Sequence, residues 1–296
     1  MSEHTKNIPA SVHARLAKVA RNLGISFNDV LQNYGMERFL YRLFKTEYAK
    51  DFVLKGGLIF TVWGIPLRRP TRDIDFLGSL DSRKETIVQV LRATTAIRVI
   101  EDGLFFEDKT IKVVQKQVDA DRFGISANLL CYLGRAEIPI SIDIGFSDEI
   151  SYSTEEIKYP TLLKDMESPV LKGYPPEFVI SEKLHAMNRF AERPSRWKDY
   201  YDIWLISENF KFDIDALQKA ITITFKNRNT KIPVGRPSFL TAEFASKYQD
   251  NWKSFLKKND LENNMVDDLS VVIENIWKFL EQPLIILEQP LIKGSA

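Results

Sequence analysis

The sequence predicts an α/β (α+β) fold: an N-terminal helical segment, a mixed sheet and a helical C-terminal domain, in that order along the chain. Two observations predict it. Apolar side chains recur at helical spacing near the N-terminus and again from Pro175 onward. Between these regions, short runs rich in β-branched and aromatic residues alternate with polar turns. We therefore expect three parts, at 1–47, 48–165 and 166–296.

Composition limits the class of protein. The 296 residues are 44% hydrophobic and 27% charged, which is typical of a globular chain and not of a disordered one. A single cysteine excludes an intrachain disulfide and zinc sites built on several thiolates. The polar start and the short apolar runs predict a soluble cytoplasmic protein with no membrane partner. The formal net charge of +1 gives no sign of a nucleic-acid partner when it is taken over the whole chain.

The N-terminal segment is predicted to form two helices. Pro9 suits a first helical turn, and Gly24 suits the end of that helix. Ser26 suits the N-cap of the next helix, with Asp29 three residues later as an approximate capping box. The apolar spacing continues past Gly35, so the second helix either runs on or is followed by a third.

The middle region is predicted to supply the sheet. Strands are expected at 52–54, 73–77, 111–118, 124–132 and 138–146, with a helix at 86–91. Cys131 lies within one of these apolar strands and is expected in the core.

The C-terminal part is predicted to be helical. One helix opens at Pro175-Pro176, and Ser195 suits the N-cap of the next. Further helices are expected at 213–223, 240–255 and 269–280. The motif Leu-Glu-Gln-Pro-Leu-Ile occurs twice, from Leu280 and from Leu287, and we interpret it as a helix end followed by an extended tail.

Asp73-Ile74-Asp75 is the sharpest chemical feature. On a strand, side chains at i and i+2 point to the same face, so both carboxylates are presented together while Ile74 is buried. Paired carboxylate oxygens are ligands that Mg²⁺ prefers, and two-metal sites of this kind serve phosphoryl transfer. Taken alone, the pair is as well explained by two surface aspartates.

Other residues strengthen this feature. Gly56-Gly57 lies between an apolar strand and an apolar helix-like run, where backbone N–H groups can approach a phosphate, although most such pairs are simple turns. Arg68, Arg69 and Arg72 directly precede the aspartates and either hold phosphate or balance the carboxylates.

Asp143 offers a third carboxylate. It alternates with Ile142 and Ile144, so its side chain points away from the isoleucines. A metal ligand or general base explains an aspartate in so apolar a strand, and a strand-end hydrogen bond is the simpler alternative.

This order of features resembles the polymerase-β-like nucleotidyltransferase superfamily. Four motifs, taken together, resemble the AbiEii/AbiGii family of nucleotidyltransferase toxins over about residues 10–205. They are Lys55-Gly56-Gly57, Arg69-Pro70-Thr71-Arg72-Asp73-Ile74-Asp75, Pro176-Glu177 with Glu182-Lys183-Leu184, and Arg196-Trp197-Lys198-Asp199-Tyr200-Tyr201-Asp202.

The resemblance implies roles for single residues. Asp73 and Asp75 match the metal-binding aspartates, with Asp143 as a third catalytic and metal-binding candidate. The resemblance gives Lys183 a contact with the nucleotide phosphates and makes Asp199 an essential acidic residue. The expected nucleotide-binding residues are Lys55, Gly56, Gly57, Arg72, Lys198 and Asp202.

Elementary chemistry leaves alternatives open at these positions. Lys183 also fits a solvated helix lysine paired with a neighbour. Asp199 and Asp202 are neighbours at i and i+3 on one helix, so their repulsion argues for a nearby cation. Asp199 can equally complement the helix N-terminus. Trp197 is the one tryptophan considered as a base-stacking residue, and His185 is expected to be structural.

A basic stretch follows at 219–237, which contains no acidic residue. We expect it either to track an RNA backbone or to be a solvated loop. Its candidate nucleic-acid-binding residues are Lys226, Arg228, Lys231 and Arg236.

The resemblance implies a metal-dependent nucleotidyltransferase toxin of a toxin–antitoxin or phage-defence system. It implies Mg²⁺ or Mn²⁺ as cofactor, a nucleoside triphosphate as substrate, the 3′ end of tRNA as acceptor and a cognate antitoxin as partner. A small-molecule nucleotidyltransferase and a non-catalytic nucleotide-binding module stay open as alternatives.

Overall fold

The computed structural model describes residues 7–65, 71–119, 122–146, 154–191, 196–262 and 266–288. The chain divides into two compact units, Met1–Tyr174 and Pro175–Ala296. The N-terminal helices therefore belong to the same unit as the sheet. That residues 1–47 form a segment of their own stays a prediction.

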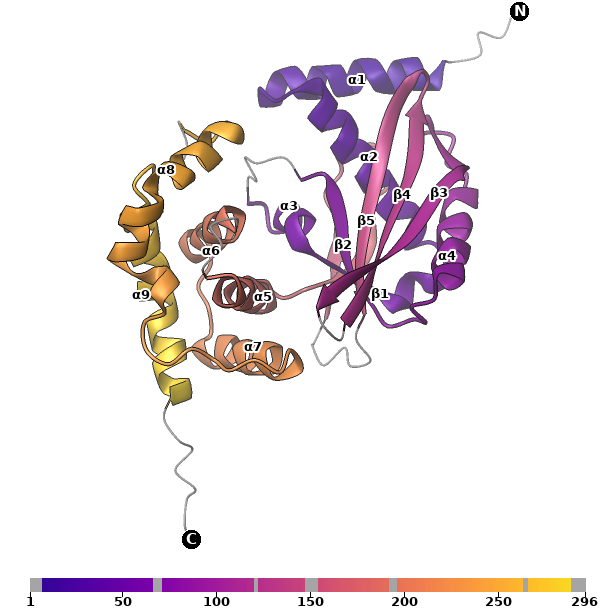
Figure 1. Ribbon diagram of the computed structural model, residues 1–296. Helices are drawn as coiled ribbons and strands as arrows, with labels where there is room; N and C mark the ends of the chain where they lie inside the picture. The colour runs from indigo at the N-terminus through magenta and orange to yellow at the C-terminus, as the bar shows by residue number, and fades with distance from the viewer. Residues whose placement is uncertain are drawn as a thin grey trace, which may run out of the picture. The chain divides into compact units, whose positions relative to one another are not determined.

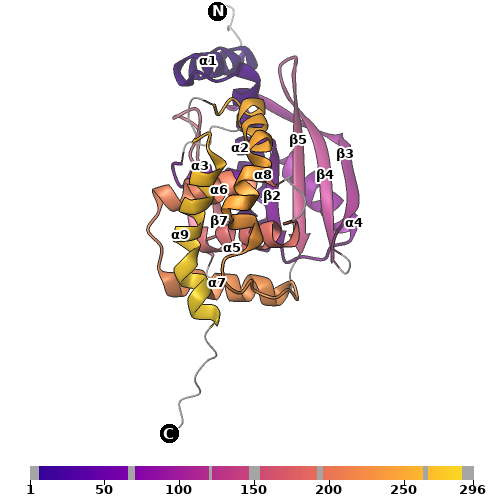
Figure 2. The ribbon, with the colours of Figure 1, turned by 60° about the vertical axis from the view of Figure 1, so that its left-hand side comes forward.

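The first unit is built on a mixed seven-stranded sheet in the order β3-β4-β5-β2-β1-β7-β6. Figure 2 shows β3, β4 and β5 as its long strands. The β2–β5 and β1–β7 pairs are parallel, and the other pairs are antiparallel. The strands are β1 (Phe52–Lys55), β2 (Asp73–Gly78), β3 (Leu104–Asp119), β4 (Arg122–Leu133), β5 (Ala136–Phe146), β6 (Glu155–Lys158) and β7 (Val170–Gly173). The expected strands of the middle region are confirmed, and Cys131 is buried.

Helices cover one face of this sheet (Figure 1). They are α1 (Ile8–Leu23), α2 (Phe27–Leu43), the short α3 (Ile59–Val62) and α4 (Lys84–Ala96). The predicted start of α2 is confirmed, because Ser26 Oγ accepts a hydrogen bond from the Asp29 N–H at 3.1 Å. Helix α2 continues through Gly35, where an added Cβ would lie 2.7 Å from Ile138 Cγ2. The missing side chain lets α2 pack closely on the isoleucine face of β5.

Four charged side chains are buried on or beside α2. Glu37, Arg38, Arg42 and Asp102 are each at most 1% exposed. Arg42 donates to both carboxylate oxygens of Asp102, at 2.6 and 3.1 Å. The Leu162 N–H donates to Glu37 Oε2 at 2.7 Å, and Arg38 Nη1 lies 3.3 Å from Glu37 Oε1. These contacts fix α2 to the segments that precede β3 and β7.

The second unit consists of helices around an aromatic core. They are α5 (Pro176–Arg189), α6 (Trp197–Asn209), α7 (Ile214–Asn227), α8 (Ala242–Lys258) and α9 (Leu269–Glu288). Figures 1 and 2 both show α8 beside α9. Helix α6 has Arg196 at its N-cap, and Ser195 lies outside the described residues. No helix of the described part combines the length and the apolar composition needed to cross a membrane.

The expected helix end near Leu280 is wrong. Helix α9 continues to Glu288 with Pro283 inside it. An internal proline costs about 3 kcal/mol in an isolated helix. Here Leu284 is fully buried, and Gln218 of α7 donates to the Pro283 carbonyl at 3.4 Å, so packing within the unit offsets that cost. The end of the second motif copy lies outside the described residues.

Glu37 predicts a pH-dependent stability. Burial raises the pKa of Glu37 to about 7, against 4.5 for a free side chain, although the Leu162 N–H and Arg38 oppose this. Between these pH values the folded chain holds a proton that the unfolded chain has released, so stability falls as pH rises from about 4.5 to 7. Glu37→Gln removes this loss, which amounts to about 3 kcal/mol. Urea unfolding at pH 5 and pH 8 measures it.

The matched control is Glu137→Gln, which changes an exposed glutamate of β5. We expect its pH slope to equal that of the wild type. Equal slopes for Glu37→Gln and the wild type would show that Glu37 titrates in its ordinary range.

Candidate active site

Three aspartates meet on the sheet face opposite α2. In the parallel pairing of β2 with β5, Asp75 is the register partner of Asp143, and Ile74 is that of Ile142. Both isoleucines are buried, so the alternation of the strands turns Asp73, Asp75 and Asp143 to the other face. One carboxylate oxygen from each lies within 4.8 Å of the others. The three side chains are exposed or half-buried, so a ligand can reach them.

Gly56 fixes the place of the Asp75 carboxylate. It follows Lys55, the register partner of Asp75 on β1, and its φ of +68° is in the left-handed region. An added Cβ would lie 2.6 Å from Asp75 Cγ and closer still to Oδ2. From the sequence, this glycine was expected only to let backbone N–H groups approach a phosphate. The structure adds a steric reason, since only glycine leaves room for the carboxylate.

Gly57 has the same relation to Thr71. An added Cβ there would lie 2.7 Å from Thr71 Oγ1. Thr71 is 9% exposed, and its hydroxyl has no hydrogen-bond partner within the described part of the chain. Arg72 follows as an exposed side chain, whereas Arg68 and Arg69 lie outside the described residues.

Lys116 is a site residue that the sequence interpretation missed. Its Nζ lies 3.1 and 3.5 Å from the two carboxylate oxygens of Asp143. It comes from the edge strand β3 and belongs to no motif. Only the register of β3, β4 and β5 brings it to the aspartates, and one sequence carries no direct signal for that register.

The second unit holds a compact charged cluster of its own. Lys183 of α5 donates to Asp202 Oδ2 at 2.6 Å and to Asp199 Oδ1 at 3.3 Å. Arg196 Nε lies 2.6 Å from Asp199 Oδ2, although its N–H is not aimed at that oxygen. The Asp199 and Asp202 side chains are 2% and 0% exposed. The cation expected near the two aspartates is thus Lys183, and Lys198 beside them is exposed.

The basic stretch does not present all its charges to solvent. Arg228 lies 3.3 Å from Glu182 and hydrogen-bonds His185, and Arg236 lies 2.7 Å from Glu274. Both arginines therefore help to hold the second unit together.

The two candidate lysines of the basic stretch are exposed, whereas Trp197 and His185 of the same unit are buried. Lys226 and Lys231 are exposed. Trp197 is buried against Tyr200 and Trp252, so it packs in the core and does not present a stacking face. His185 is buried and hydrogen-bonded to Thr230, as expected of a structural residue.

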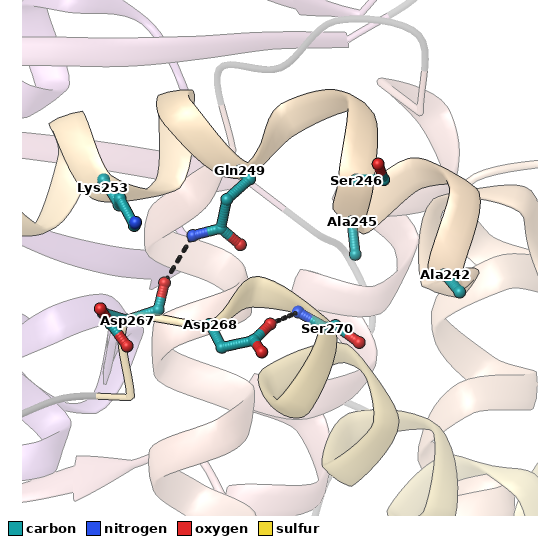
Figure 3. Close-up of a pocket in the computed structure, with 8 residues that line it drawn as sticks. All are labelled: Ala242, Ala245, Ser246, Gln249, Lys253, Asp267, Asp268 and Ser270. Carbon is teal, nitrogen blue, oxygen red and sulfur yellow. Dashed lines mark hydrogen bonds between the residues drawn. The ribbon is translucent and has the colours of Figure 1, made fainter.

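A polar hollow of about 610 Å³ opens between α8 and the start of α9 (Figure 3). Gln249 donates to the Asp267 carbonyl at 2.6 Å, and the Ser270 N–H donates to Asp268 at 2.8 Å (Figure 3). Its lining residues are Ala242, Ala245, Ser246, Gln249, Lys253, Asp267, Asp268 and Ser270. None of the predicted site residues lines it.

Comparison with known proteins assigns the chain to a family. A family model described as the nucleotidyl transferase AbiEii toxin of a type IV toxin–antitoxin system matches residues 38–279. The chain belongs to the AbiEii family. It is therefore a nucleotidyltransferase of a toxin family, and the resemblance carried by the four motifs is confirmed. No curated protein matches the chain.

Two solved structures are similar to this AbiEii-family protein. The crystal structure of JHP933 from Helicobacter pylori is 18% identical, with a TM-score of 0.50 over 88% of this chain and 97% of that one. Another crystal structure from H. pylori, of a protein thought to be a nucleotidyltransferase, is also 18% identical, with a TM-score of 0.49 over 90% and 100%. With the mixed sheet, the family and JHP933 confirm the predicted polymerase-β-like fold class.

Gly56 gives the first prediction for this site. Gly56→Ala adds a methyl group where the Asp75 carboxylate lies, so we expect it to weaken Mn²⁺ binding at least tenfold. Gly64→Ala is the matched control, because Gly64 has the same φ of +68° and the described residues place no neighbouring atom within 4 Å of the added Cβ. Titration with Mn²⁺ followed by electron paramagnetic resonance measures both. Equal Mn²⁺ affinities in the two variants would show that the Asp75 carboxylate can move aside without weakening Mn²⁺ binding.

The charged cluster around Lys183 gives a second prediction. Lys183→Met leaves two buried carboxylates without their shared partner, so we expect the second unit to lose about 3 kcal/mol of stability. Adding Asp202→Asn should recover most of that loss, because Asp199 keeps Arg196 beside it. Urea unfolding measures stability, and Lys219→Met, at an exposed lysine of the same unit, is the control.

Transferase activity of the double variant separates two roles for Lys183. Restored stability with lost activity assigns Lys183 a part in the reaction, provided that Asp202→Asn alone keeps its activity. Restored stability together with restored activity would make Lys183 a structural residue only.

Proposed function

We propose that this AbiEii-family enzyme transfers a nucleoside monophosphate from a nucleoside triphosphate to the 3′ end of an RNA, with tRNA as the acceptor. The observation that carries the proposal is the convergence of Asp73, Asp75 and Asp143 in a chain of this family. Exposed basic residues such as Lys226 and Lys231 are compatible with a polyanionic acceptor. The choice of tRNA rests on the family resemblance.

The aspartate cluster fits a divalent cation. Its three oxygen donors are hard ligands of the kind that Mg²⁺ and Mn²⁺ take, and they lie close enough to share an ion. The Lys116 ammonium beside Asp143 shows that the cluster already attracts positive charge. Asp73, Asp75 and Asp143 would hold the metal. When bound, it would neutralise charge on the phosphoryl group that is transferred.

The chain's own residues divide the remaining tasks. Asp143 accepts the proton of the acceptor 3′-hydroxyl. The hydroxyl oxygen then forms a bond to the α-phosphorus as the bond to the β-phosphate bridge breaks, and pyrophosphate leaves with that electron pair. Lys55, Arg72 and the N–H groups of Gly56 and Gly57 hold the leaving phosphates.

The family resemblance implies nucleotide-binding roles for residues of the second unit as well. Lys183 contacts the nucleotide phosphates, and Asp199 holds Lys183 in place. Lys198 and Asp202 complete the nucleotide-binding set. A cognate antitoxin is the biological partner that a toxin–antitoxin family implies. A cytoplasmic location and a part in phage defence stay predictions.

Label transfer tests this proposal. Incubation of the purified protein with each α-³²P-labelled nucleoside triphosphate, Mg²⁺ and tRNA should move label onto the RNA. Asp75→Asn removes one carboxylate charge from the cluster, so we expect a loss of at least a thousandfold. Asp108→Asn, at an exposed aspartate of β3, should keep wild-type activity.

Other outcomes favour other functions. Label on small hydroxyl compounds but not on RNA would make the protein a small-molecule nucleotidyltransferase. Nucleotide binding without any transfer would make it a binding module. Transfer of γ-label in place of α-label would make it a kinase. Growth arrest that persists with Asp75→Asn would show that catalysis is not the cause of toxicity.

A further inference from the structure

Lys116 reaches the aspartates over a row that lacks side chains. Lys116 of β3 is the register partner of Gly124 on β4, and Gly124 is the partner of Gly145 on β5. Gly145 is two residues from Asp143, so the two positions share a face of the sheet. With glycine at both positions this row carries no side chain, and Ser126, the register partner of Asp143 on β4, adds only a small one beside it. The lysine can therefore lie across β4 with its Nζ 3.1 Å from the carboxylate.

The ion pair of Lys116 with Asp143 is weak enough to exchange. The two side chains are 55% and 42% exposed. A pair exposed to this degree contributes little to stability, because water screens its charges. A phosphate accepts a charge-assisted hydrogen bond from an ammonium group at least as well as a carboxylate does. Lys116 can thus leave Asp143 for a phosphate of a bound ligand at little cost.

The strand order places Lys116 and the Gly56–Gly57 turn on opposite sides of the aspartates. The sheet runs β3-β4-β5-β2-β1, with Asp143 on β5 and Asp75 on β2 in the middle. The glycine turn follows β1 on one side, and Lys116 comes from β3 on the other. In-line displacement needs the attacking and leaving groups on opposite sides of the phosphorus. If the glycine turn holds the leaving phosphates, the β3 side belongs to the acceptor.

Lys116 also lies where a long acceptor can approach. Strand β3 is an edge of the sheet and has β4 as its sole neighbour among the described strands. Lys112 is exposed and lies on the same face of β3 as Lys116, since their pairing with β4 is regular between them. Two lysines on one face of an edge strand form a short basic track that leads to the aspartates.

We propose that Lys116 binds a backbone phosphate near the 3′ end of the acceptor strand, above the flat floor that Gly124 makes on β4. This inference rests on the proposed transfer to RNA and adds an acceptor subsite to it. Lys55 is the nucleotide-side counterpart. Its Nζ lies 3.8 Å from where a Cβ on Gly145 would lie, so the nucleotide side reaches as far as Gly145 on β5 and the acceptor side begins at Gly124 on β4.

Steady-state kinetics on the full chain test the subsite. We expect Lys116→Met to lower kcat/KM for tRNA about tenfold and to leave KM for the nucleoside triphosphate within twofold. We expect Lys55→Met to raise KM for the nucleoside triphosphate about tenfold and to leave kcat/KM for tRNA, measured at saturating nucleotide, within twofold. The log–log dependence of tRNA affinity on salt should become shallower by about 0.7 for Lys116→Met, because one phosphate contact is lost. Lys116→Arg should keep most of the acceptor affinity.

Lys109→Met is the matched control. Lys109 is exposed on the same strand, seven residues and roughly 24 Å from Lys116. If Lys116→Met behaves as Lys109→Met does while the wild type labels tRNA, the acceptor subsite is wrong and the proposed function stands. A raised nucleotide KM with unchanged acceptor kinetics would place Lys116 on the nucleotide side. A wild-type protein that labels no RNA overturns the proposed function and the subsite together.

Discussion

The close approach of Gly56 to Asp75 is the constraint on which the aspartate site depends. A left-handed residue without a side chain ends β1, and the carboxylate of the neighbouring strand occupies the space that a Cβ would fill. The same turn places Gly57 against Thr71, so two successive glycines pack against β2 and the residues that precede it. The turn that is expected to meet phosphate is thus also the part of the fold that sets the position of Asp75, a candidate metal ligand.

Much of this arrangement could be predicted because it follows local rules. The period of two in Asp73-Ile74-Asp75 and around Asp143 gave the faces of both strands, and the N-cap at Ser26 gave a helix start. Long-range pairing could not be predicted. The parallel register of β2 with β5 and the reach of Lys116 across β4 depend on contacts between distant segments. The helix end expected near Pro283 was wrong for the same reason, since packing against α7 outweighs the tendency of proline to end a helix.

Charge in this protein is organised by pairing. The whole-chain value of +1 hides two acidic groups with different environments. The aspartates of β2 and β5 stay accessible and have a weakly held lysine beside them. Asp199 and Asp202 are buried and tightly held by Lys183. A buried pair keeps its geometry and an exposed one exchanges partners, so the two groups suit positioning and ligand binding respectively.

The parallel pairing of β2 with β5 has a consequence for the point at which the aspartate cluster of a newly made chain forms. The strand that completes the aspartate cluster is made only after β3 and β4, and a one-residue slip of its register would turn Asp143 to the covered face. A nascent or mispaired chain therefore has no assembled site. The aspartate cluster is therefore complete only when β5 has paired with β2 in the correct register.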